Sequence, residues 1–190
     1  IVVVGGSYIV WDIIVTSWGE WGFNPAYLSG LYVINLPIEE ILFFVTVPYA
    51  CLFIYEGLLY TTEHRTFRIP RPLLGVAIAS LVILGLVFFN QGYTMKAFLS
   101  CALFLSLMAM LNMALIEDRQ YWLWLAICYI PFLIFNMVLT ALPVVQYNPA
   151  AIFGVRFITI PLEDFFYNFS MLSFYLFVYV LAKRVLGVKD

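Results

Sequence analysis

The same membrane-type segment occurs twice in this sequence. Residues 11–44 align without a gap onto residues 135–168, at a constant offset of 124. The aligned positions with identical residues include Thr16 and Thr140, Asn24 and Asn148, Pro25 and Pro149, Ala26 and Ala150, Gly30 and Gly154, Ile34 and Ile158, Pro37 and Pro161, and Glu39 and Glu163. A chain with this internal repeat is expected to fold into two related halves that share one site.

Each copy contains the element Pro-x-Glu-acid within or beside an apolar run. The acids are Glu39 and Glu40 in the first copy, and Glu163 and Asp164 in the second. Ionisable side chains are costly in such surroundings and usually have a function there. The repeat therefore predicts that each half contributes a carboxylate pair to the shared site.

The composition indicates a membrane protein. Hydrophobic residues make up 65% of the chain and charged residues 11%, whereas soluble domains have about 25% charged residues. A net charge of −2 without a basic stripe gives no indication of a nucleic-acid partner. Cys51, Cys101 and Cys128 lie in apolar runs without metal-ligand spacing. We expect them to be packing residues, and we expect no metal site.

The apolar runs predict an all-α membrane protein with six visible spanning helices, because a span needs about 20 apolar residues. The candidates are residues 1–17, 37–60, 72–90, 95–116, 121–142 and 158–182. Residues 26–36 are expected to form a short re-entrant or interfacial piece, with a second one near 150–160. The asparagines of Asn24-Pro25 and Asn148-Pro149 are expected to cap these pieces.

The repeat also predicts a seventh helix before residue 1, as the counterpart of the fourth visible span. The chain would then consist of two parallel three-helix repeats, at residues 1–71 and 95–190, joined by a linking helix at residues 72–94. The positive charges that follow the second, fourth and sixth spans are Arg65, Arg68, Arg71, Arg119, Lys183, Arg184 and Lys189. The positive-inside rule makes this face, and with it the C-terminus, cytoplasmic.

Two carboxyls that meet in a cavity of low dielectric do not easily both ionise, so a protonated acid would stand beside an ionised base. Glu39 and Glu40 diverge by about 100° on a helix, so only one acid of each pair needs to face the site. Asn35 would share a face with Glu39 if the helix ran through Pro37. A glutamate in the first helical turn is also a common cap, but its occurrence in two copies favours a function.

Further residues are expected to bind substrate or to orient the acids. Asp12 aligns with Asn136, late in the preceding span, where both residues orient the carboxyls or tie the helices together. Phe43, Phe44 and Tyr167 follow the acids, and aromatic faces stabilise cations. Core packing is the alternative role for these rings.

Several catalytic signatures are not found in the sequence. There is no Gly-x-Gly-x-x-Gly fingerprint for a flavin or nicotinamide, no histidine cluster for iron, and no Asp-x-x-x-Asp element for magnesium diphosphate. We therefore expect no cofactor. The groups that remain available for catalysis are acids and aromatic rings in an apolar cavity.

At these residues the chain resembles the small membrane-integral lycopene cyclases, which occur as two-subunit bacterial enzymes and as fused versions. The resemblance rests on residues 35–44 and 161–167, with support from residues 21–25. It covers nearly the whole chain, and the presence of both halves in one polypeptide is similar to the fused form. The missing first helix is a departure from it.

The resemblance implies a lycopene β-cyclase, an isomerase that converts lycopene to γ-carotene and β-carotene without net redox. A proton would be delivered to C2, the C5–C6 double bond would attack the resulting cation, and a proton would leave C6. Glu39 or Glu163 is the expected acid, and Glu40 or Asp164 the base or charge stabiliser, although these roles can be exchanged. The expected location is a bacterial inner membrane, where lycopene and lipid are the partners.

Three alternatives stay open at this stage. They are a cyclase for longer C50 carotenoids, a proton-coupled transporter, since internal repeats and intramembrane acids are common in transporters, and a non-catalytic carotenoid-binding subunit. The sequence also leaves open a homo-oligomer, an association with other carotenoid enzymes, and the number of rings formed.

Overall fold

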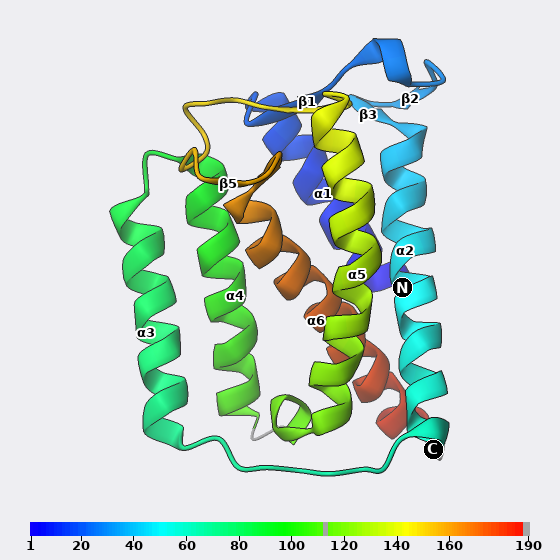
Figure 1. Ribbon diagram of the computed structural model, residues 1–190, viewed down its shortest axis with the longest axis vertical. Coiled ribbons are helices and arrows are strands. Elements are labelled where there is room, and N and C mark those ends of the chain that lie inside the picture. Colours follow the sequence, from blue (N-terminus) through cyan, green and yellow to red (C-terminus); the bar gives the residue numbers. More distant parts are fainter. Residues whose placement is uncertain (112–113, 188–190) are drawn as a thin grey trace.

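The computed structural model describes residues 1–111 and 114–187, and in this part of the chain six α-helices form an elongated bundle (Figure 1). The helices are α1 (Val2–Ser17), α2 (Ile38–Thr61), α3 (Arg71–Val87), α4 (Gly92–Met110), α5 (Arg119–Ala141) and α6 (Leu162–Leu186). The short elements are β1 (Trp21–Phe23), η1 (Pro25–Tyr27), β2 (Tyr32–Val33), β3 (Leu36–Pro37), η2 (Ala114–Glu117), β4 (Val145–Tyr147), β5 (Arg156–Phe157) and β6 (Ile160–Pro161). All the strands lie at one end of the bundle.

Four of the six helices are long and apolar enough to cross a membrane, namely α2, α4, α5 and α6. The helices α1 and α3 are apolar but shorter, with 16 and 17 residues. The helical class and the membrane association are therefore confirmed. Six complete spans, and the division into two three-helix repeats, stay predictions.

The two aligned segments have the same local structure at the start of α2 and α6. The hairpin of β2 with β3 has its equivalent 124 residues later in the hairpin of β5 with β6. The two-residue turns contain Ile34 and Ile158, whose φ angles are 62° and 58°. This left-handed conformation is rare for a β-branched residue, so its occurrence at both aligned positions shows that the backbone follows the repeat through strained turns.

These hairpins correct two expectations from the sequence. Asn35 lies in the turn before β3, and α2 begins only at Ile38, with Pro37 as its cap residue. Asn35 and Glu39 therefore do not share a helix face. The segment at residues 26–36, expected to be a short re-entrant or interfacial piece, forms a short 3-10 turn and a hairpin and not a re-entrant helix. Asn24 does cap that turn, because its side chain accepts a 3.1 Å hydrogen bond from the Ala26 amide.

Backbone pairing also joins the two copies. Strands β1 and β4 are antiparallel, with Trp21 opposite Tyr147 and Phe23 opposite Val145. In addition, the Asn148 amide group donates a 3.0 Å hydrogen bond to the carbonyl of Gly19. This small sheet joins the segments that follow α1 and α5 at one end of the bundle.

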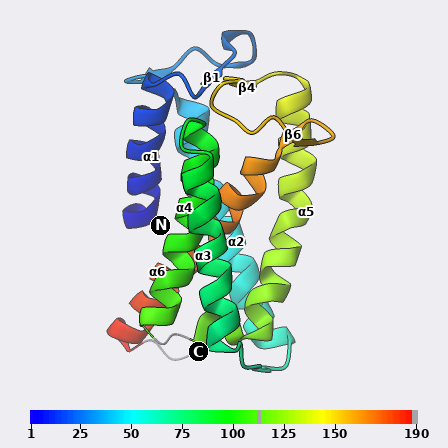
Figure 2. The same cartoon turned by 90° about the vertical axis from the view of Figure 1, so that its left-hand side faces the viewer.

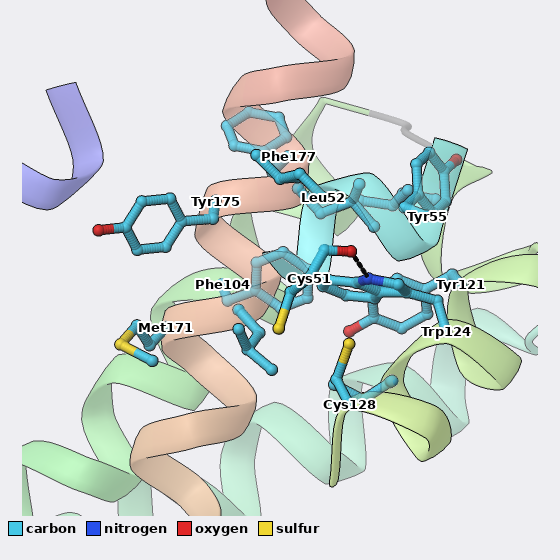
Figure 3. Close-up of a cluster of buried hydrophobic side chains, with 14 of the residues drawn as sticks. Cys51, Leu52, Tyr55, Phe104, Tyr121, Trp124, Cys128, Met171, Tyr175 and Phe177 are labelled. Atoms are coloured by element: carbon cyan, nitrogen blue, oxygen red, sulfur yellow. Dashed lines mark hydrogen bonds between the residues drawn. The ribbon is translucent and has the colours of Figure 1, made fainter. Parts of the chain in front are cut away.

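A packed core of aromatic, aliphatic and sulfur side chains joins the helices (Figure 3). Trp124 of α5 is fully buried, and its indole N–H donates a 2.6 Å hydrogen bond to the Cys51 carbonyl of α2. Cys51 and Cys128 are free buried thiols, as expected from the sequence. Helix α4 packs between α3 and α6 (Figure 2).

Candidate functional site

A cavity of about 520 Å³ lies between the helices, beneath the sheet of β1 and β4. Three carboxyl side chains from three helices line it: Asp12 of α1, Glu40 of α2 and Asp164 of α6. The remaining wall is mostly apolar. Three carboxyl groups set in a mostly apolar wall are the main polar feature of this cavity.

Asp164 is surrounded by hydrogen-bond donors. The Tyr93 hydroxyl of α4 donates to Oδ1 at 2.7 Å, while the Asn136 amide of α5 and the Tyr147 hydroxyl donate to Oδ2 at 2.7 and 2.8 Å. Asp164 is 4% exposed. A buried carboxyl that accepts several hydrogen bonds is stabilised in its ionised form by those bonds.

Tyr147 lies on β4, outside the helices, and burial raises the pKa of its hydroxyl well above the ordinary value. The hydroxyl therefore stays protonated and can serve as a donor at every pH in the physiological range.

The first copy has a different arrangement. Asp12 Oδ1 accepts from the Trp21 indole N–H at 2.7 Å and from the Thr16 hydroxyl at 3.3 Å, while Asp12 Oδ2 is buried without a hydrogen-bond partner. Glu40, the counterpart of Asp164, lines the same cavity as Asp12. Two neighbouring carboxyls in an apolar cavity avoid simultaneous ionisation by keeping a proton.

The chemistry of the two copies thus differs at equivalent positions. Asn136 donates to Asp164 in the second copy, whereas the equivalent pair in the first copy is Asp12 and Glu40. An amide next to a carboxyl group donates a hydrogen bond to it and favours the ionised carboxylate. Two neighbouring carboxyl groups instead favour the retention of a proton. The repeat has diverged so that one half suits a proton donor and the other suits a carboxylate.

Several aromatic rings lie beside the carboxyls in the cavity, beneath the sheet of β1 and β4. The Tyr93 ring lies 4.9 Å from Trp21, 5.8 Å from Tyr147 and 6.1 Å from Tyr167, measured between centroids. Phe43 also lines the cavity. Ring faces are negative and attract a cation within about 6 Å, so this group of aromatic rings suits a positively charged intermediate.

The cavity opens to the side of the bundle between α2 and α5. Val47, Phe135 and Leu139 line it, and at the same time they are 37%, 67% and 37% exposed at the surface. A hydrocarbon chain can reach the carboxyls through this side opening without passing through water.

The structure separates the four predicted acids into two groups. Glu40 and Asp164 line the cavity, whereas Glu39 and Glu163 do not. Glu39 Oε1 accepts from the Ser29 amide at 2.7 Å, and Glu163 Oε1 accepts from the Phe153 amide and the Thr94 hydroxyl, both at 2.5 Å. Each of these two glutamates therefore holds the loop that precedes its own helix.

The predicted binding residues also separate. Phe43, Tyr167, Asp12 and Asn136 line the cavity. Phe44 is buried and stacks on Tyr8 at 6.0 Å. Asn35 donates a 2.9 Å hydrogen bond to the Ile13 carbonyl and holds the hairpin against α1.

The cavity residues that the sequence did not single out include Trp21, Tyr93 and Tyr147, whose side chains bond the carboxyls. A signal existed for Tyr147, because it aligns with Phe23 and differs from it by an added hydroxyl. No such signal existed for Tyr93, which lies outside the aligned segments. Within the described residues, no group of three His, Cys, Asp or Glu side chains is placed to hold a metal ion.

The apolar helices and the carboxyl-lined cavity together define a helical membrane protein with three acidic side chains in a mostly apolar cavity. The family model for lycopene cyclase matches residues 1–58 and 90–182, and the chain belongs to this family of carotenoid-cyclising enzymes. The matched residues include both copies of the repeat, and the whole of α3 falls between the two matched ranges. Searches of curated proteins and of solved structures found no match.

Proposed function

We propose that this protein is a lycopene β-cyclase, which closes β-rings at the ends of lycopene to give γ-carotene and then β-carotene. Membership of the lycopene cyclase family gives the substrate class. The observation that carries the reaction is the unequal carboxyl set, with the Asp12–Glu40 pair opposite an Asp164 that accepts three hydrogen bonds.

The Asp12–Glu40 pair is the proton donor in this proposal. Glu40 is the acid that reaches substrate, because among the described residues its side chain has no hydrogen-bond partner that would compete for the proton. Asp12 is fixed by Trp21 and keeps the shared proton on the pair. The proposed acid is therefore Glu40, which lines the cavity, and not Glu39 or Glu163, the residues expected from the sequence.

The proton adds to C2 of the terminal double bond and leaves a cation at C1. The C5–C6 double bond attacks C1, which closes the ring and moves the cation to C5. Tyr93, Tyr167 and Phe43 face this cation with their rings. Because the cavity is apolar, water is excluded and does not capture the cation as an alcohol.

Asp164 is the counter-ion and the final base. Its carboxylate stabilises the developing positive charge, and then accepts the proton from C6 to form the C5–C6 double bond of a β-ring. One proton enters and one leaves, so the reaction is an isomerisation without oxidant or reductant. Exchange with water returns Asp164 and the Asp12–Glu40 pair to their starting states.

The side opening suggests that the enzyme handles one end of the polyene at a time. An end group enters between α2 and α5 from the lipid, and the remaining chain stays in the bilayer. β-Carotene then requires release and a second binding event with the other end. In the cell we place the strand-bearing end of the bundle outside and the C-terminus in the cytoplasm of a bacterial inner membrane, because Arg65, Arg119 and Arg184 lie at the opposite end.

Cyclisation in heavy water tests this proposal. The purified protein is reconstituted in liposomes that contain lycopene and heavy water. The pigments are separated by chromatography, and their molecular masses are measured by mass spectrometry. We expect γ-carotene and β-carotene that carry a single deuterium for each ring, at C2. Lycopene heated in protein-free liposomes is the control.

Unchanged lycopene would contradict the substrate assignment, and conversion of C50 carotenoids instead would identify the longer-chain cyclase. Rings without deuterium would contradict delivery of a solvent-exchangeable proton.

A further inference from the structure

We infer that the polyene chain behind the reacting end group lies lengthwise in the apolar part of the cavity, along α2 and α5, and that Ile54 marks the inner end of this chain-binding groove. The groove is lined by Ala50, Cys51 and Ile54 of α2, Cys128 and Pro131 of α5, and Leu172 of α6. The inference rests on the proposed function for the identity of the ligand, a long conjugated hydrocarbon. It adds a site for the part of the substrate that does not react.

The cavity is elongated along the helices. Its carboxyls lie near the strand-bearing end of the bundle, because Glu40 and Asp164 are in the first turns of α2 and α6. Ile54 lines the same cavity, and the helical rise of about 1.5 Å per residue puts it about 21 Å along α2 from Glu40. A space of about 520 Å³ with this length is narrow. Its shape therefore suits a chain better than a compact molecule.

The lining residues form stripes on two neighbouring helices. On α2, Val47, Ala50 and Ile54 follow one another at intervals of three and four residues, which puts them on one side of the helix. On α5, which runs in the opposite direction (Figure 1), Cys128 and Pro131 are about one turn apart. The two stripes form the walls of a track that leads away from the carboxyls.

Charge is confined to one end of this track. Within the described residues, the charged side chains that line the cavity are Asp12, Glu40 and Asp164. Beyond Thr46, the lining from α2 consists of aliphatic and thiol side chains. A hydrocarbon chain can lie there without removing polar groups from their partners, whereas a polar chain would lose its own hydrogen bonds.

The packed core closes the inner end of the groove. Cys51 and Leu172 are 5% and 1% exposed, and the Cys51 carbonyl accepts the hydrogen bond from the buried indole of Trp124 (Figure 3). Side chains packed at this density do not move aside without cost. A chain that follows the groove therefore stops near Ile54 and leaves towards the lipid.

The length of the groove fits roughly half of a C40 polyene. An extended chain advances about 1.2 Å per atom, as the polypeptide backbone does, so about 21 Å holds roughly 17 chain atoms. The other half of the molecule then lies in the bilayer, in agreement with the handling of one end at a time.

Stiffness gives the groove a basis for selecting a polyene. Lipid tails are as apolar as the groove, so apolar character alone does not favour either ligand. A conjugated chain is straight and stiff, and it loses little conformational freedom in a narrow space. A saturated chain has to give up many bond rotations, which weakens its binding.

Binding of lycopene to the purified protein in lipid nanodiscs tests this inference. Lycopene has no stereocentre and gives no circular dichroism in lipid, but a chain held in an asymmetric groove acquires a signal in its visible absorption band. Ile54→Trp fills the inner end of the groove. Phe53→Trp is the matched control, because Phe53 is adjacent on α2, is 73% exposed and does not line the cavity. Ile54→Phe makes a smaller change, in case the tryptophan variant does not fold.

We expect the wild-type protein and Phe53→Trp to give the same saturable signal. Ile54→Trp should need about 10-fold more lycopene for half-saturation, with Ile54→Phe in between, because the added atoms overfill the space. The fully hydrogenated chain of the same length should compete at least about 10-fold less well than lycopene.

The absence of a signal from the wild-type protein would overturn the inference, as would unchanged half-saturation in the folded Ile54 variants. Equal competition by the hydrogenated chain would also overturn it and make the groove a site for lipid tails. The pigment is recovered after each titration and separated by chromatography. Bound lycopene recovered without rings would contradict the proposed function alone, whereas normal rings with no effect at Ile54 would contradict the groove alone.

Discussion

The Tyr147 hydroxyl donates a 2.8 Å hydrogen bond to Oδ2 of Asp164, although its counterpart in the first copy, Phe23, has no hydroxyl to donate. The second copy has therefore gained a donor at the position where its carboxyl accepts. Together with Asn136 in place of Asp12, this difference supports the proposal that the carboxyls of the two copies have different roles.

Replacement of Tyr147 by phenylalanine removes this donor and keeps the ring. A hydrogen bond to a charged group contributes about 1.5–3 kcal/mol, so we expect ring formation to slow roughly 10- to 100-fold if the bond acts in the transition state. The measurement is the initial rate of ring formation in liposomes. The control is Tyr27→Phe on the exposed loop, which should keep the wild-type rate. A wild-type rate for Tyr147→Phe would show that this bond contributes nothing to catalysis.

Two single variants test the divergence between the copies: each one gives Asp12 or Asn136 the side chain found at the equivalent position of the other copy. Asp12→Asn gives the first copy the amide-and-acid pair of the second, so Glu40 loses its carboxyl partner. We expect lycopene to accumulate in cells that make this variant. Asn136→Asp puts a second acid beside Asp164 and should also lower ring formation, because the repulsion disfavours the carboxylate.

Pigment chromatography of lycopene-producing bacteria, with the amount of each protein measured by immunoblot, compares these variants. Normal rings from a well-expressed Asp12→Asn protein would contradict the role of the Asp12–Glu40 pair.

Trp124 is predicted to be a main contributor to stability. The side chain is fully buried, and it also bonds the Cys51 carbonyl. Trp124→Ala should lower the free energy of unfolding by about 3–5 kcal/mol, since it leaves a large cavity. Thermal unfolding in detergent measures this. Trp122→Ala is the neighbouring control, and its cost should be smaller because Trp122 is 40% exposed. Equal losses would mean that the packing around Trp124 is not what stabilises the bundle.

The side opening between α2 and α5 predicts a variant that folds but does not admit substrate. Ala50 is an exposed residue that also lines the cavity, so Ala50→Trp should narrow the opening and raise the lycopene concentration needed for half-maximal rate. Leu103→Trp, at an exposed position of α4, is the matched control. An unchanged concentration dependence for Ala50→Trp would place the entrance elsewhere.

The helices could be predicted closely from the sequence, because runs of apolar residues and prolines at their starts leave few alternatives. The repeat also indicated correctly that residues around both Pro-x-Glu-acid elements share a local structure. The hairpins were missed because the left-handed positions of a two-residue turn usually hold Gly or Asn, whereas here Ile34 and Ile158 hold the first turn position with a left-handed backbone.

The cavity itself could be predicted only in part. Glu40 and Asp164 were among the expected acids, but adjacent acids on a helix look alike in a sequence, and only the three-dimensional structure distinguishes those that face the cavity from those that face a loop. Tyr93 comes from a helix outside the aligned segments, so no sequence comparison within the chain pointed to it. Its role follows from the packing of α4 against α6.

The most direct test of this account compares Glu40→Gln with Glu39→Gln in lycopene-producing bacteria. The two changes are identical in chemistry and adjacent in sequence, but only Glu40 lines the cavity. The amide of the Glu39→Gln variant can still accept from the Ser29 amide through its carbonyl oxygen. We predict that Glu40→Gln leaves lycopene unconverted, while Glu39→Gln still forms rings. Rings from Glu40→Gln and none from a well-expressed Glu39→Gln would contradict Glu40 as the proton donor.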